Sequence, residues 1–178
     1  MMGNTMTAVG RRRKLHTLGP DRGPGFGLVL AALVTAGLCL AGPIRAATTQ
    51  RVVIDRNSGL AISGFDPVAY FTDAQPLSGK GEFEQVVGGT VWRFRSAGNR
   101  AAFMADPDVY TPRFGGYDPV GVARGVAVAG NPRLWVIRDE RLYLFYAPET
   151  RDEFASNGDR MIATADREWP ALNRLLVP

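Results

Sequence analysis

Residues 64–69 read GFDPVA, and residues 116–121, which begin 52 positions later, read GYDPVG. In both stretches a glycine precedes an Asp-Pro step, and these residue types favour turns between short strands. A second pair follows at nearly the same offset, because VWRF at residues 91–94 is matched by LYLF at residues 142–145. We therefore predict an internal repeat. The alternative is a coincidence among Pro- and Gly-rich turns.

Two β-hairpins are predicted at corresponding places. Gly88-Gly89 separates two β-rich runs within residues 82–95, and paired glycines favour a two-residue turn with positive φ. The same offset places a second hairpin within residues 134–146, around the turn Asp139-Glu140.

A helix is predicted after each hairpin. Ser96 is a good N-cap for the first helix, and Asp106-Pro107 ends it. Pro148 lies near the start of the second helix, where its missing N–H matters little. Apolar residues then recur at helical spacing from Arg160 to Leu176, in a stripe that we expect to be a packing face broken at Trp169-Pro170.

These elements predict an α+β fold: two tandem β-hairpin–helix units with a helical C-terminal tail. The pseudo-repeats span residues of about 60–110 and 112–165, and the tail spans residues 160–178. The working domain is expected to cover residues 47–178.

The first 46 residues are predicted to be an export signal. A basic run at residues 11–14 precedes the apolar stretch of residues 26–41, and the small or aliphatic pair Ile44 and Ala46 follows. This order is typical of a cleaved signal peptide. An uncleaved membrane anchor is the alternative, and it would be the chain's one route to a membrane. The expected location is the periplasm or the cell exterior.

Removing this leader changes the charge of the protein. The whole chain has 21 basic and 17 acidic residues, a net charge of +4. Six of the basic residues and one acidic residue lie in the leader, which leaves 15 basic and 16 acidic residues, a net charge of −1. We therefore expect no nucleic-acid partner.

The leader also contains His16 and Cys39, the only histidine and the only cysteine of the chain. Residues 47–178 consequently lack the groups needed for Ser-His-Asp or Cys-His nucleophiles, for disulfides, and for zinc, copper or iron–sulfur sites with His or Cys ligands. No metal and no cofactor is predicted.

Residues 91–110 (VWRFRSAGNRAAFMADPDVY), together with the opening Asp-Pro-Val of residues 66–68, resemble the YHS-domain family. The match covers about 45 residues well. The chain from residue 47 onward also resembles the exported, stand-alone branch of that family, which has no settled activity. The resemblance therefore implies a fold and an exported location, but no catalytic activity.

The departures from the family concern its metal chemistry. Metal-handling relatives carry cysteines where this chain has Ala69, Arg95 and Asn99, and the exported branch often has one where this chain has Asp118. Because thiolates select soft metals, a soft-metal role does not follow from the resemblance. A metal-handling domain that has lost its ligands is one alternative reading.

Asp66 and Asp118 are the first candidate site residues. An Asp before Pro favours turn initiation, and its carboxylate can cap nearby N–H groups, which is the structural reading. The functional reading is that two pseudo-symmetric carboxylates meet between the units. There they would bind a hard cation, or act as the acid and base of a hydrolase or lyase.

The segment of residues 110–124 (YTPRFGGYDPVGVAR) joins the two units, where a cleft would form. Arg113, Tyr117 and Arg124 on this segment could hold an anion or a carboxylate ligand. The structural reading is a tight connector with Tyr117 in the core. We expect a non-enzymatic binding or accessory module that holds a small ligand or an exported partner protein between its units. Its candidate ligand-binding residues are Asp66, Tyr70, Arg113, Tyr117 and Asp118.

Overall fold

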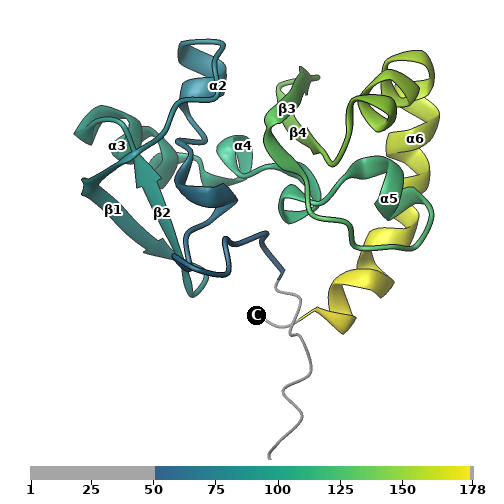
Figure 1. The fold of residues 1–178 in the computed structure, drawn as a ribbon, viewed down its shortest axis with the longest axis horizontal. Helices are drawn as coiled ribbons and strands as arrows, with labels where there is room; N and C mark the ends of the chain where they lie inside the picture. The colour runs from purple at the N-terminus through teal and green to yellow at the C-terminus, as the bar shows by residue number, and fades with distance from the viewer. Residues whose placement is uncertain (1–50, 177–178) are drawn as a thin grey trace, which may run out of the picture. The chain divides into compact units, whose positions relative to one another are not determined.

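The computed structural model describes residues 51–176, so the predicted leader lies outside the described residues. These residues belong to one compact unit, and none of their helices is long and apolar enough to cross a membrane. The elements follow one another along the chain as shown in Figure 1. They are η1 (Ile62–Gly64), α2 (Ala69–Thr72), β1 (Lys80–Val87), β2 (Thr90–Phe94), α3 (Ala97–Ala105), α4 (Pro107–Tyr110), η2 (Arg113–Gly116), α5 (Pro119–Ala123), β3 (Asn131–Arg138), β4 (Arg141–Phe145) and α6 (Pro148–Leu175).

The fold is α+β, with two hairpin–helix units and a C-terminal helix, as the sequence predicts. β1 pairs with β2 and β3 pairs with β4, each pair forming a separate antiparallel two-stranded sheet. We call these the first and the second hairpin. Both tight turns have positive φ, at Gly88-Gly89 and at Asp139-Glu140. Both hairpins also shift register at corresponding places, between Lys80 and Glu84 and between Asn131 and Trp135.

The helices begin where the sequence predicts. The Ser96 hydroxyl accepts a hydrogen bond from the Asn99 N–H (3.1 Å) and caps α3, and Pro148 occupies the first turn of α6. The predicted break at Trp169-Pro170 is wrong, because α6 continues through Pro170 as far as Leu175. Its one residue with non-helical backbone angles is Asn157 (φ −138°, ψ 28°). We call the part of α6 after Asn157 the tail helix.

Two hydrophobic cores lie on opposite faces of the second hairpin. Leu142 and Leu144 of β4 belong to the first core, which also holds Trp92, Phe94 and Phe103 from the first unit. Tyr143 and Phe145 alternate with them along the strand and belong to the second core, with Phe154 of α6. Successive residues of a strand point to opposite faces. The second hairpin is therefore a wall shared by both cores.

Residues 51–55 form an extended arm that contacts both units. Val53 donates its N–H to the carbonyl of Gly115 (2.8 Å) and accepts a hydrogen bond from the N–H of Ile62 (2.8 Å). Gly115 (φ +63°) lies so close to the arm that a Cβ atom there would meet the Arg51 carbonyl oxygen. The arm thus ties η1 of the first unit to η2 of the second.

Candidate functional site

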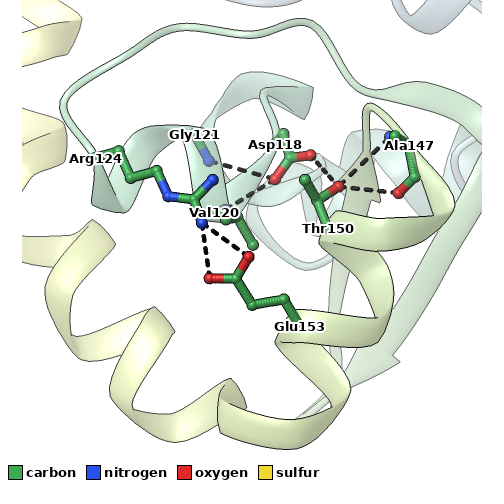
Figure 2. Close-up of polar contacts among 7 residues, drawn as sticks. All are labelled: Asp118, Val120, Gly121, Arg124, Ala147, Thr150 and Glu153. Carbon is green, nitrogen blue, oxygen red and sulfur yellow. Dashed lines mark hydrogen bonds and ion pairs between the residues drawn. The ribbon is translucent and has the colours of Figure 1, made fainter.

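Asp118 is a buried carboxylate that joins three elements (Figure 2). Its Oδ1 accepts a hydrogen bond from the N–H of Val120 at the start of α5 (2.8 Å). Its Oδ2 accepts hydrogen bonds from the N–H of Tyr146, just after β4 (2.8 Å), and from the hydroxyl of Thr150 in α6 (2.6 Å). The side chain therefore fixes the end of the second hairpin against two helices.

Asp66 makes the corresponding contacts in the first unit. It is fully buried, and its Oδ1 accepts from the N–H of Val68 (2.8 Å). Its Oδ2 accepts from the N–H of Arg95, just after β2 (2.7 Å), and from the side-chain amide of Asn99 in α3 (2.7 Å). Both oxygens of each Asp are thus bound within its own unit, which supports the structural reading of the pair.

No metal cluster supports the functional reading either. Among residues 51–176, no group of three or more His, Cys, Asp or Glu side chains could hold a metal ion.

Tyr70 and Tyr117 both lie in the interior. The Tyr70 hydroxyl donates to the carbonyl of Pro132 (2.8 Å), and its ring meets Trp135 of the second hairpin edge-on at 5.3 Å. Tyr117 is 3% exposed, and its ring lies 6.2 Å from that of Trp169. Burial raises the pKa of Tyr70, and it raises that of Tyr117 to about 12. The structure therefore places both tyrosines in the packing between elements and not in an open groove.

Arg113 lies on a cavity of about 370 Å³, which we call the connector pocket. Three segments line it: the chain around α4 and η2, the start of β4, and the tail helix. Its lining residues are Asp108, Thr111, Pro112, Arg113, Phe114, Arg141 and Trp169. Of the five predicted site residues, Arg113 is the one that lines this cavity.

The two arginines of the connector pocket differ in their partners. Arg113 forms an ion pair with Asp166 of the tail helix, and its guanidinium lies 5.2 Å from the centre of the Phe114 ring. Its Nε is buried and has no hydrogen-bond acceptor among the described residues. Arg141 donates to the carbonyl of Asp108 and forms no ion pair within residues 51–176. Arg141 is therefore a half-buried cation that no described carboxylate neutralises.

Aromatic side chains form the apolar part of the pocket. Trp169 meets Phe114 edge-on, with ring centres 5.7 Å apart. The Tyr143 ring lies 6.4 Å from that of Phe114 and is 3% exposed. Burial raises the pKa of Tyr143; the nearby charges of Arg113 and Arg141 act to lower it, and those of Asp166 and Asp139 act to raise it. The phenol thus lies within the electrostatic reach of both arginines.

Sequence reasoning missed Arg141, Asp108 and the pocket role of Trp169. Arg141 corresponds in offset to Thr90, so the repeat gives no signal for a cation there. Trp169 packs against the second core as predicted for the tail, and it also lines the pocket. These residues come together through tertiary packing, which no short motif records.

A second cavity, of about 320 Å³, lies between α5 and α6. Arg124 and Glu153 both line it and bind each other through two hydrogen bonds, of 2.9 and 2.8 Å (Figure 2). The other arginine of this lining, Arg160, is exposed, whereas Arg141 is half-buried. We therefore regard the connector pocket as the better candidate site.

Comparison of the chain with protein-family models, with curated proteins and with solved structures gave no significant match.

Proposed function

We propose that this chain is a non-enzymatic, exported binding module that holds a small ligand in the connector pocket through a carboxylate group on that ligand. The observation that carries the proposal is Arg141, a half-buried residue of the pocket whose guanidinium donates to the Asp108 carbonyl and has no carboxylate partner within residues 51–176. A carboxylate can bind such a guanidinium through two parallel hydrogen bonds.

The size and the lining of the pocket also favour a small ligand. Its volume of about 370 Å³ lies near the lower end of the range for ligand pockets, which is about 300–1,000 Å³. Trp169 and Phe114 supply apolar surface, and Thr111 adds a hydroxyl group. The lining is mostly polar, with an aromatic part, so it suits a small ligand that is held chiefly by its charged group.

The sequence supports a binding role over catalysis. Residues 47–178 have no histidine or cysteine, and Asp66 and Asp118 use both carboxylate oxygens inside their own units. The predicted export signal and the resemblance to the exported YHS branch support a place outside the cytoplasm.

The test uses isothermal titration calorimetry with 3-phenylpropanoate, a monoanion with one ring. We expect saturable binding to the purified protein, and a loss of about tenfold or more in Arg141→Gln, since hydrogen bonds to charged groups contribute about 1.5–3 kcal/mol. Arg167→Gln is the matched control, because Arg167 is an exposed arginine of the tail helix outside the pocket lining. Circular dichroism shows whether each variant is folded.

Two outcomes would overturn the proposal. One is the absence of binding to the folded wild-type protein. The other is equal affinity in wild type and Arg141→Gln, which would place the anion elsewhere. Arg141→Lys keeps the charge without the planar fork, so we expect an affinity between those of the wild type and Arg141→Gln.

A further inference from the structure

We propose that the ligand of the connector pocket is a small zwitterion with an apolar side chain, of the class of free amino acids. This inference rests on the proposed function, because it adds an ammonium group to the ligand whose carboxylate binds Arg141.

First, two opposite charges without ion-pair partners among the described residues lie on the connector pocket. Asp108 and Arg141 both line the connector pocket. Within residues 51–176 neither side chain forms an ion pair, with the other or with any third residue. Arg141 is instead held by the main-chain carbonyl of Asp108, which leaves the Asp108 carboxylate unused by that contact. A ligand with a carboxylate and an ammonium group can complement both.

The second step is the charge balance of the site. Arg113 lies on the pocket, but Asp166 already neutralises it. The remaining charges, from Arg141 and Asp108, sum to zero. A phosphate or a dicarboxylate would bring a second negative charge close to Asp108 and Asp166, and like charges at short range repel. The balance therefore favours a ligand of zero net charge that carries both signs.

The third step is the apolar wall. Half-buried Trp169 presents aromatic surface to the pocket, with the buried Phe114 and Pro112 beside it in the lining. An apolar side chain on the ligand would gain from leaving water against these rings. One ring suits the cavity, whose volume is near the lower end of the range for ligand pockets.

The experiment compares three probes that share a phenylethyl body and differ in their charged groups: L-phenylalanine, 3-phenylpropanoate and phenethylamine. In calorimetric titrations of the purified protein we expect L-phenylalanine to bind about tenfold or more tighter than either single-charge probe. The reason is that a second charge-assisted hydrogen bond contributes about 1.5–3 kcal/mol.

Variants at Asp108 assign the ammonium site. Asp108→Asn should remove the preference for L-phenylalanine over 3-phenylpropanoate without weakening 3-phenylpropanoate, whereas Asp108→Glu should keep part of that preference. Asp159→Asn is the matched control, because Asp159 is a strongly exposed carboxylate on α6 outside the pocket lining. Because Asp108 is also exposed, both of its variants are expected to fold.

The outcomes separate this inference from the proposed function. If L-phenylalanine and 3-phenylpropanoate bind equally and Arg141→Gln weakens both, the zwitterion inference is wrong and the anion site stands. If an unchanged preference for L-phenylalanine persists in Asp108→Asn, the ammonium group lies elsewhere and the inference is also wrong. If neither probe binds, both proposals fail.

Discussion

Asp66 and Asp118 show how one side chain can organise a whole unit. Each precedes a proline, which restricts the backbone of the residue before it to extended conformations. Each carboxylate then accepts a hydrogen bond from the N–H two residues later. It accepts another from the N–H of the residue directly after its hairpin, which is Arg95 in the first unit and Tyr146 in the second. A third donor comes from the following helix, at Asn99 or Thr150. Turn, hairpin and helix are therefore joined at one buried carboxylate.

This arrangement predicts a large loss of stability in Asp118→Ala. The substitution leaves the N–H groups of Val120 and Tyr146 without their acceptor, and an unsatisfied buried donor costs about 1–3 kcal/mol. We expect the free energy of unfolding to fall by about 3–5 kcal/mol, measured by urea denaturation followed by circular dichroism. Thr150→Val removes one donor to Asp118 and the cap contacts of the same hydroxyl with Ala147, and it should cost about 1–2 kcal/mol. A loss below 1 kcal/mol in Asp118→Ala would contradict the structural role.

At this scale the sequence predicts local roles better than it predicts the site. The turn role of the two Asp-Pro steps follows from the chemistry of neighbouring atoms. The position of Tyr117 in the core was one of two open readings, because an aromatic residue beside glycines suits a groove as well as a core. Arg141, Asp108 and Trp169 lie far apart in the sequence and meet only in the folded chain. Residues that meet only through tertiary packing form no short sequence motif, so the pocket could not be predicted from the sequence.

At the scale of elements, the hairpins were predictable because a turn and its strands are local. The first turn lies at Gly88-Gly89, as the paired glycines predict. The second lies 51 residues later at Asp139-Glu140, where the repeat predicts a turn although neither residue is a glycine. The break in α6 was not predictable, because tertiary packing decided it. Trp169, beside Pro170, packs against the second core. The kink of α6 lies instead at Asn157, 51 positions after Asp106, the C-cap of α3.

We expect substitutions at the two hairpin turns to change the free energy of unfolding in opposite directions. Glu140 has φ +56°, a conformation that glycine adopts without strain, and it forms no ion pair within the described residues. We expect Glu140→Gly to raise the free energy of unfolding by about 0.5–1 kcal/mol. Gly89, at the matching position of the first turn, has φ +78° and open space around it. Gly89→Ala should therefore lower stability by about 1 kcal/mol through backbone strain alone. Urea denaturation of both variants tests the pair, and equal signs would contradict it.

At the scale of the molecule, two of four matched positions distinguish the two hairpins by charge. The face of the second hairpin that packs on the first core carries Trp135, Ile137, Leu142 and Leu144. The residues 51 positions earlier are Glu84, Val86, Val91 and Arg93, where Glu84 and Arg93 form a cross-strand ion pair (2.5 Å) and Val86 is 60% exposed. The first hairpin thus carries charge where the second carries apolar surface. Terminal units of tandem folds need such a polar outer face.

The other end of the tandem is closed by the tail helix. Ala165, Trp169 and Leu172 pack against the second core, just as the second hairpin packs against the first. Each core therefore needs a neighbouring element to complete it: the second hairpin for the first core and the tail helix for the second. Neither unit could therefore bury its core with its own Asp-Pro turn, hairpin and helix alone.

The shared wall predicts that the two cores unfold together. Phe103 and Phe154 occupy corresponding helix positions, are almost fully buried, and contact aromatic rings of β2 and β4 respectively. Phe103→Ala and Phe154→Ala should each lower the free energy of unfolding by about 3–5 kcal/mol. Because β4 contributes alternate residues to both cores, either loss should shift one common transition. In urea, circular dichroism and tryptophan fluorescence should give coincident curves, as a two-state transition requires. Trp92 reports on the first core and Trp169 on the second. If Phe154→Ala instead produced two separate transitions, the second hairpin would remain folded on the first core alone, and the units would be independent.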